Sequence, residues 1–161
     1  MHQKMERGKS IKHFGKVQLV GFRVLCDGEK YIEEIPKAAS ELKERTTEIS
    51  NIVHPVQQIG AFIVDTPTPD KDGYWIGVPV SKYDNIPSNM ITLTIPSQKY
   101  ASILHKGPNN QIQSSYAELH KWMECNEYPR SNHSWNIELY QENNDPAHTS
   151  NVHVELCDSM M

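Results

Sequence analysis

The sequence has no apolar run long enough to cross a lipid bilayer, and its polar start, MHQKMERGKSIKHFGK, has no apolar core of a secretory signal. It also lacks the excess of basic residues that marks nucleic-acid-binding domains, because its formal net charge is -4 and its isoelectric point is about 6.0. We therefore expect a protein that binds neither membranes nor nucleic acid directly.

Cysteine is scarce as well. The three cysteines, Cys26, Cys125 and Cys157, are odd in number and widely spaced, which predicts reduced thiols in a cytoplasmic protein rather than a disulfide framework. The eight histidines are scattered and form no metal-ligand spacing. No phosphate-binding glycine loop and no nucleophile beside a base is recognisable, so we expect no metal and no cofactor.

The length of 161 residues suits one domain. We expect a flexible N-terminal tail over residues 1–15 and one domain over residues 16–158. The pattern of apolar residues predicts a strand, a helix and two strands over residues 16–82, and the same order again over residues 90–158. In the first half Pro36 suits the first turn of the helix. In the second half the helix carries the apolar stripe Ile112, Tyr116, Leu119 and Met123.

Two such units predict an α+β fold. The two pseudo-symmetric β-α-β-β repeats would form an antiparallel sheet with both helices on one face and a ligand cleft on the other. The stretch SWNIELYQ, residues 134–141, alternates like a strand of that sheet. The period of two sends Ile137 and Leu139 toward the helices, and it sends Asn136, Glu138 and Tyr140 to the helix-free face.

The strand GYWIGVPV, residues 73–80, is harder to orient because both of its faces are apolar. If Trp75 shares a side with Glu138, an aromatic wall and a carboxylate meet in one cleft. Gly77 beside Trp75 would then leave room for a ligand.

The runs YASILHKGP, YAELHKWM, IELY and GYWIGV resemble the GyrI-like small-molecule-binding domain, the effector-binding domain of bacterial multidrug-responsive regulators. The resemblance covers nearly the whole chain. It implies two half-domains around a cleft for flat, apolar, often cationic compounds. In such domains an acidic residue lies on the strand after the second helix, which here is Glu138, and the cleft is bordered by the segment Gly107 to Ile112.

The regulators of this family carry a helix-turn-helix domain ahead of the effector domain, which the short polar start here cannot hold. We therefore expect a freestanding member. The expected ligand-binding residues are Glu138, Tyr140, Trp75, Asn136, Ile112 and Gly107. Several also have plain structural interpretations: Glu138 as a solvated strand residue, Trp75 and Tyr140 as packing residues, and Asn136 as a hydrogen-bonding residue. His105, in LHKGP, suits a strand-end histidine that satisfies nearby backbone.

Three functions stay open at this stage. The first is a binding module for a hydrophobic, aromatic or cationic small molecule, for sequestration or for signalling to a partner protein. The second is a cofactor-free hydrolase of strained-ring toxic compounds, in which Glu138 is the catalytic residue. The third is an interaction protein, such as an inhibitor of a DNA topoisomerase.

Overall fold

The computed structural model describes residues 8–161 and contains one eight-stranded antiparallel sheet and two α-helices. This confirms the α+β fold. In space the strands follow the order β1-β6-β8-β7-β3-β4-β2-β5. The helices are α1 (Tyr31–Arg45) and α2 (Ile112–Cys125), and the strands are β1 (Lys9–Phe14), β2 (Val17–Val24), β3 (Ile59–Ile63), β4 (Tyr74–Pro79), β5 (Ile91–Ile95), β6 (Gln98–Gly107), β7 (Trp135–Tyr140) and β8 (Val152–Ser159).

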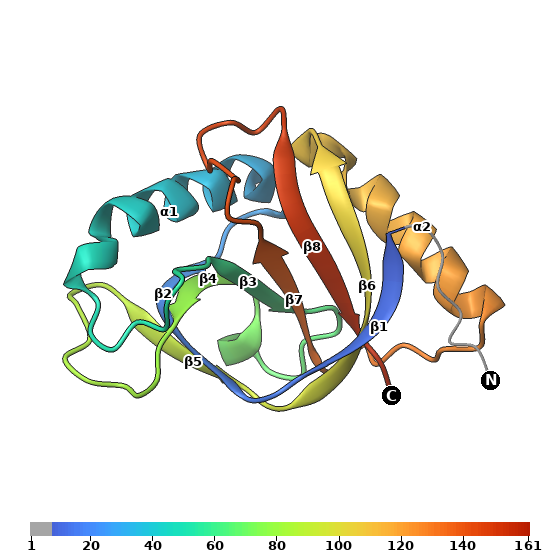
Figure 1. Cartoon of the computed structure of the whole chain (residues 1–161), viewed down its shortest axis with the longest axis horizontal. Coiled ribbons are helices and arrows are strands. Elements are labelled where there is room, and N and C mark those ends of the chain that lie inside the picture. Colours follow the sequence, from blue (N-terminus) through green and yellow to red (C-terminus); the bar gives the residue numbers. More distant parts are fainter. Residues whose placement is uncertain (1–7) are drawn as a thin grey trace.

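Both helices pack on the same face of the sheet, one over each half of the chain (Figure 1). Helix α1 buries Ala39 and Leu42 against β2 and β4. Helix α2 buries Tyr116, Leu119 and Met123 against β6 and β8, which is the stripe that the sequence predicts. The two helices stand apart, with β7 and β8 running between them (Figure 1). Within the described chain, neither helix is long and apolar enough to cross a membrane.

Helix α1 begins earlier than the sequence suggests. It starts at Tyr31, so Pro36 lies inside the helix rather than in its first turn. Proline has no N–H, and the carbonyl of the residue four positions earlier, Ile32, therefore loses its helical partner. The side chain of Asn109 donates a hydrogen bond to that carbonyl at 3.2 Å. A partner from the other half of the chain thus compensates for the proline.

The prediction of a loose tail over residues 1–15 is wrong for residues 9–14, which form β1; residues 1–7 lie outside the described part. Strand β1 pairs with β6, and β2 pairs with β5. The two pairs share one continuous register, so that each step forward along β1 and β2 is matched by one step back along β6 and β5. Phe14 lies opposite Gln98, and Val17 lies opposite Ile95. The segments β1–β2 and β5–β6 therefore form one long two-stranded ribbon, because the pairing of β2 simply continues through the short break between the strands.

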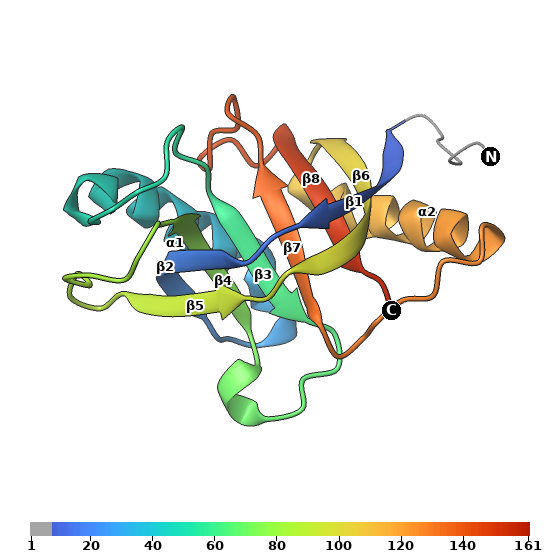
Figure 2. The same cartoon turned by 60° about the horizontal axis from the view of Figure 1, so that its bottom comes forward.

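This ribbon folds across the face of the sheet opposite the helices (Figure 2). Its side chains build a core there with the inner strands, which includes Leu19, Ile95, Tyr100, Trp75 and Ile137. That core occupies much of the helix-free face, where the sequence predicts a ligand cleft. A cavity of about 640 Å³, lined by Trp75 and Trp135 among others, remains beside it, but Glu138 lies on the opposite face.

Candidate functional site

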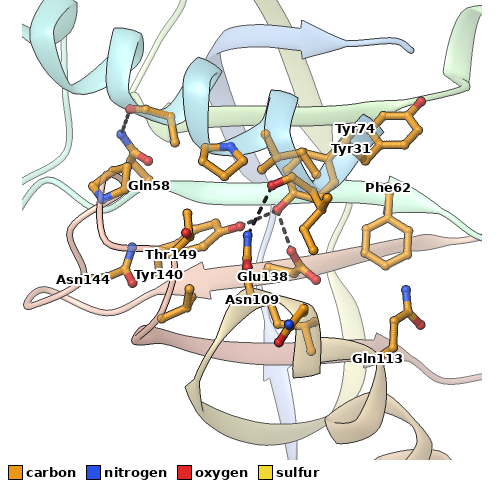
Figure 3. Close-up of a pocket in the computed structure, with 18 of the residues that line it drawn as sticks. Tyr31, Gln58, Phe62, Tyr74, Asn109, Gln113, Glu138, Tyr140, Asn144 and Thr149 are labelled. Carbon is orange, nitrogen blue, oxygen red and sulfur yellow. Dashed lines mark hydrogen bonds between the residues drawn. The ribbon is translucent and has the colours of Figure 1, made fainter. Parts of the chain in front are cut away.

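A pocket lies on the helix-bearing face, in the gap between α1 and α2 (Figure 3). Its volume is about 390 Å³, within the range of small-molecule sites. The floor is formed by β3, β4 and β7, and the walls by the first halves of the two helices and the loop between β7 and β8. The pocket exists because each helix covers only its own half of the sheet.

Strand β7 places Glu138 on the floor of this pocket. Glu138 and Tyr140 both point toward the helices, whereas Ile137 and Leu139 point into the core beneath the ribbon. The alternation is the predicted one, but the assignment of the two faces is reversed. The reason is that the helix-free face is buried too, so the more apolar pair of side chains belongs to the ribbon core.

Two tyrosine hydroxyls hold the Glu138 carboxylate. Tyr74 donates to Oε1 at 2.5 Å and Tyr116 donates to Oε2 at 2.6 Å. The hydroxyls of Tyr74 and Tyr140 lie 2.9 Å apart. A phenol has a single hydrogen, and Tyr74 gives its hydrogen to Glu138, so Tyr140 is the donor to Tyr74. The carboxylate is thus the end of a short chain of hydrogen bonds.

Burial sets the electrostatics of this cluster, since the Glu138 residue is only 6% exposed. Burial raises the pKa of the Glu138 carboxyl, while the hydrogen bonds from Tyr116 and Tyr74 oppose part of that rise. Burial and the adjacent Glu138 carboxylate raise the pKa of Tyr74 and of Tyr116, so both phenols remain donors. The pocket therefore holds a carboxylate that water no longer stabilises.

Gly60 makes the bond between Tyr74 and Glu138 possible. Tyr74 lies on β4 and Glu138 on β7, and β3 runs between them with Gly60 directly opposite Glu138. The Tyr74 side chain crosses β3 at this glycine. A Cβ atom on Gly60 would lie 1.7 Å from the Tyr74 hydroxyl oxygen, so any larger residue would displace the ring.

Asn109 joins three elements at the mouth of the pocket. Its side chain donates to the Ile32 carbonyl of α1, and its backbone N–H donates to the Thr149 carbonyl in the β7–β8 loop at 2.8 Å. Asn109 itself begins the short 3-10 turn, Asn109–Gln111, that leads into α2. The bond to Ile32 uses the carbonyl that Pro36 leaves free, and it fixes the distance between the two helix starts.

The chemistry of the lining is aromatic and acidic. Phe62 stacks on Tyr74 with ring centroids 6.1 Å apart and meets Tyr116 edge-on at 6.2 Å. The described lining residues include the carboxylates of Glu138, Asp72 and Asp145 and no lysine, arginine or histidine. Five aromatic rings line the pocket, those of Tyr31, Phe62, Tyr74, Tyr116 and Tyr140.

Three of the six residues expected to bind a ligand line the pocket, namely Glu138, Tyr140 and Ile112. Asn136 lies outside the lining and accepts hydrogen bonds from the backbone and hydroxyl of Ser159 at 2.7 and 2.8 Å, which is a structural role. Gly107 ends β6 outside the lining.

Trp75 is on the opposite face, where it packs edge-on against Trp135 with centroids 5.2 Å apart. The space beside it at Gly77 is filled by β2: a Cβ on Gly77 would lie 2.9 Å from the Val20 carbonyl oxygen. The space that the missing side chain of Gly77 leaves is therefore occupied by β2 and not available to a ligand.

Sequence reasoning missed Tyr74 and Phe62 as pocket residues and treated Tyr116 as core. A signal for Tyr116 was present, because it is the polar member of the apolar stripe of α2, and a buried phenol needs a hydrogen-bond partner. No comparable signal marks Tyr74, since its bond to Glu138 depends on the register of three strands.

Comparison with solved structures finds the same fold in several proteins. SAV2435, solved bound to tetraphenylphosphonium, is 16% identical with a TM-score of 0.69, covering 98% of this chain and 94% of that one. The C-terminal domain of EcmrR is 18% identical with a TM-score of 0.65, covering 95% and 96%. In the EcmrR–DNA complex the match, at 18% identity and a TM-score of 0.65, covers 94% of this chain and 56% of the longer one.

A hydrolase from Listeria innocua is 12% identical with a TM-score of 0.54, covering 97% of this chain and 93% of that chain. No curated protein matches the sequence. The family model of the GyrI-like small molecule binding domain matches residues 10–157, almost the full length of the described chain. The chain therefore belongs to the family of GyrI-like small-molecule-binding domains.

Proposed function

We propose that the chain binds lipophilic cations in the pocket between α1 and α2, with Glu138 as the counter-charge. The observation that carries this proposal is the buried Glu138 carboxylate, held by Tyr74 and Tyr116 in a pocket whose described lining has no basic side chain. A carboxylate removed from water is costly unless a partner compensates for the lost hydration. The tyrosine hydroxyls compensate in part, and a cationic ligand completes the neutralisation.

The aromatic lining supports the same ligand class. Tyr and Phe faces attract cations and offer a large apolar surface at the same time. A compound with a delocalised or shielded positive charge and several rings loses little hydration on entering such a pocket. Tetraphenylphosphonium, the ligand of SAV2435, has these properties and is a suitable probe for this chain.

A pair of ions of nearly equal shape and opposite charge tests the proposal. Tetraphenylphosphonium should bind in calorimetric titrations, whereas tetraphenylborate should not, because the pocket discriminates by charge. Glu138→Gln should weaken phosphonium binding about tenfold or more, the factor that corresponds to about 1.4 kcal/mol. Asn136→Ala, outside the lining, is the matched control from the same strand. Equal affinity for the two ions would refute the role of the carboxylate.

Hydrolysis of strained-ring compounds is a second candidate function. The raised pKa of Glu138 favours it, because an upward shift brings a carboxyl closer to the range in which it can act as a general acid or base. The likeness to a hydrolase from Listeria innocua points in the same direction. A cyclopropane-bearing electrophile should then give many product molecules per protein chain, and Glu138→Gln should abolish the turnover. If the product never exceeds one equivalent per chain, hydrolysis is refuted and only the binding function remains.

A further inference from the structure

The end of β6 lies beside the start of α2 (Figure 1). A smaller cavity, separate from the pocket of Glu138, is lined by residues of both segments. Its volume is about 270 Å³, and it shares no lining residue with the larger pocket. His105 and Ser115 both line it. His105 belongs to the LHKGP run, and the proposed function gives it no role.

The two side chains are in direct contact. The Ser115 hydroxyl oxygen lies 2.7 Å from His105 Nδ1, and His105 Nε2 lies 3.1 Å from the carbonyl oxygen of Pro108. A carbonyl can only accept, so Nε2 carries the hydrogen and the backbone fixes the tautomer of the neutral ring. Nδ1 then presents its lone pair, and the Ser115 hydroxyl donates to it.

The orientation of Ser115 is unusual for a helical serine. Serine inside a helix commonly bonds back to a carbonyl of the preceding turn or faces water, but Ser115 points its hydroxyl at a histidine on a neighbouring strand. His105 is only 4% exposed, whereas Ser115 is partly exposed and borders the cavity. The base is thus shielded, and the oxygen that it activates faces the space that a substrate can enter.

We propose that Ser115 is a nucleophile activated by His105, with Pro108 as the group that orients the base, and that this site cleaves activated carboxylic esters. A nucleophile within hydrogen-bond reach of a base that is itself oriented by a third group is the arrangement of covalent catalysis. The inference needs neither Glu138 nor the ligand of the larger pocket, so either proposal can fail without the other.

The chemistry balances without a cofactor. The Ser115 oxygen forms a bond to the ester carbonyl carbon while its proton moves to His105 Nδ1. The tetrahedral intermediate then breaks its bond to the leaving oxygen, which takes that proton and departs as the alcohol. Water, deprotonated by Nδ1, hydrolyses the acyl group from Ser115. Lys106 and Gln111 line the same cavity and carry N–H groups that would stabilise the oxyanion.

A fluorophosphonate probe tests the proposal directly. The Ser115 oxygen attacks phosphorus, the P–F bond breaks, fluoride leaves and the serine proton passes to His105. Peptide mapping by mass spectrometry of the whole chain should place the label on Ser115. His105→Gln should slow labelling about 100-fold or more, the lower end of what a positioned base contributes, and Ser115→Ala should abolish it.

Ser114→Ala is the matched control, because Ser114 is the exposed neighbour on the same cavity wall and its loss should leave labelling unchanged. An unchanged melting temperature and an unchanged circular dichroism spectrum confirm that the variants fold. Absence of label on Ser115 in the wild-type chain would overturn the proposal whatever the variants do. Label spread over several serines, or labelling of His105→Gln at the wild-type rate, would overturn it too.

Discussion

At the scale of single residues, the site depends on where hydrogen atoms lie around one carboxyl group. Glu138 accepts hydrogen bonds from Tyr74 and Tyr116, and Tyr140 extends the chain. These bonds favour the ionised form, while burial favours the neutral form and outweighs them, so the pKa of Glu138 is raised. Glu138 therefore binds a proton more tightly than a carboxyl in water does, and a cation in the pocket would favour its ionised form.

The raised pKa of Glu138 predicts how stability depends on pH. A carboxyl whose pKa is higher in the folded state binds its proton more tightly there. Its contribution to the stability of the fold is therefore greatest at pH values below its pKa in the unfolded state, near 4.5. This contribution is lost as the pH rises through the pKa of the folded state. We expect the stability of the wild type relative to Glu138→Gln to fall from pH 4.5 upward. Urea unfolding of both proteins across this range measures the difference, and parallel curves would contradict the shift.

Gly60 offers a second prediction at this scale. Gly60→Ala should displace Tyr74 from Glu138, because the added carbon would lie 1.7 Å from the Tyr74 oxygen. A buried group that loses its partner costs about 1–3 kcal/mol, and urea unfolding should show a loss of at least this size. Gly28→Ala is the control, since a Cβ at Gly28 meets nothing within 4 Å. Equal effects of the two changes would mean that Tyr74 does not depend on the glycine.

At the scale of the elements, a hydrogen bond links the two helices. It is accepted by the Ile32 carbonyl, which Pro36 leaves without a partner in α1. In helix α1 the Ile32 carbonyl has no helical partner, and Asn109 supplies one from the start of α2. This bond spans the mouth of the pocket. The same contact thus corrects a local defect in α1 and positions the second helix.

A double-mutant cycle tests this link. Asn109→Ala should cost about 1 kcal/mol in the free energy of unfolding, because it leaves the Ile32 carbonyl without its partner. In a Pro36→Ala background the same change should cost less, because the new N–H at position 36 bonds to that carbonyl within the helix. Asn110→Ala, a change of the exposed neighbour, serves as the control. Equal costs in both backgrounds would show that the proline and the asparagine act independently.

Some features of these elements can be predicted from the sequence and others cannot. Their order and type, the stripe of α2 and the alternation along β7 follow from local periodicity. Which face of β7 the helices cover does not follow, because residues 135–139 of that strand are all buried and both faces are packed. The start of α1 was missed because Pro36 suggested a first turn, and the distant compensation by Asn109 leaves no local signal.

At the scale of the whole molecule, closure by the ribbon decides where the site lies. The segments β1–β2 and β5–β6 pair along their length and cover the helix-free face with a packed core. The gap between the helices stays open and forms the cavity of about 390 Å³ that Glu138 lines. The sequence could not show the closure, because it depends on pairing between segments some eighty residues apart.

A cation bound beside Glu138 should favour the ionised form of this carboxyl and so release the proton that it binds at low pH. Calorimetric titration of tetraphenylphosphonium in buffers of different ionisation enthalpy, between pH 4.5 and neutrality, counts the protons released on binding. We predict that the wild type releases a substantial fraction of one proton at the lower end of this range, that the release falls as the pH rises, and that Glu138→Gln releases none. Binding of equal strength without proton release at every pH in both proteins would contradict the account.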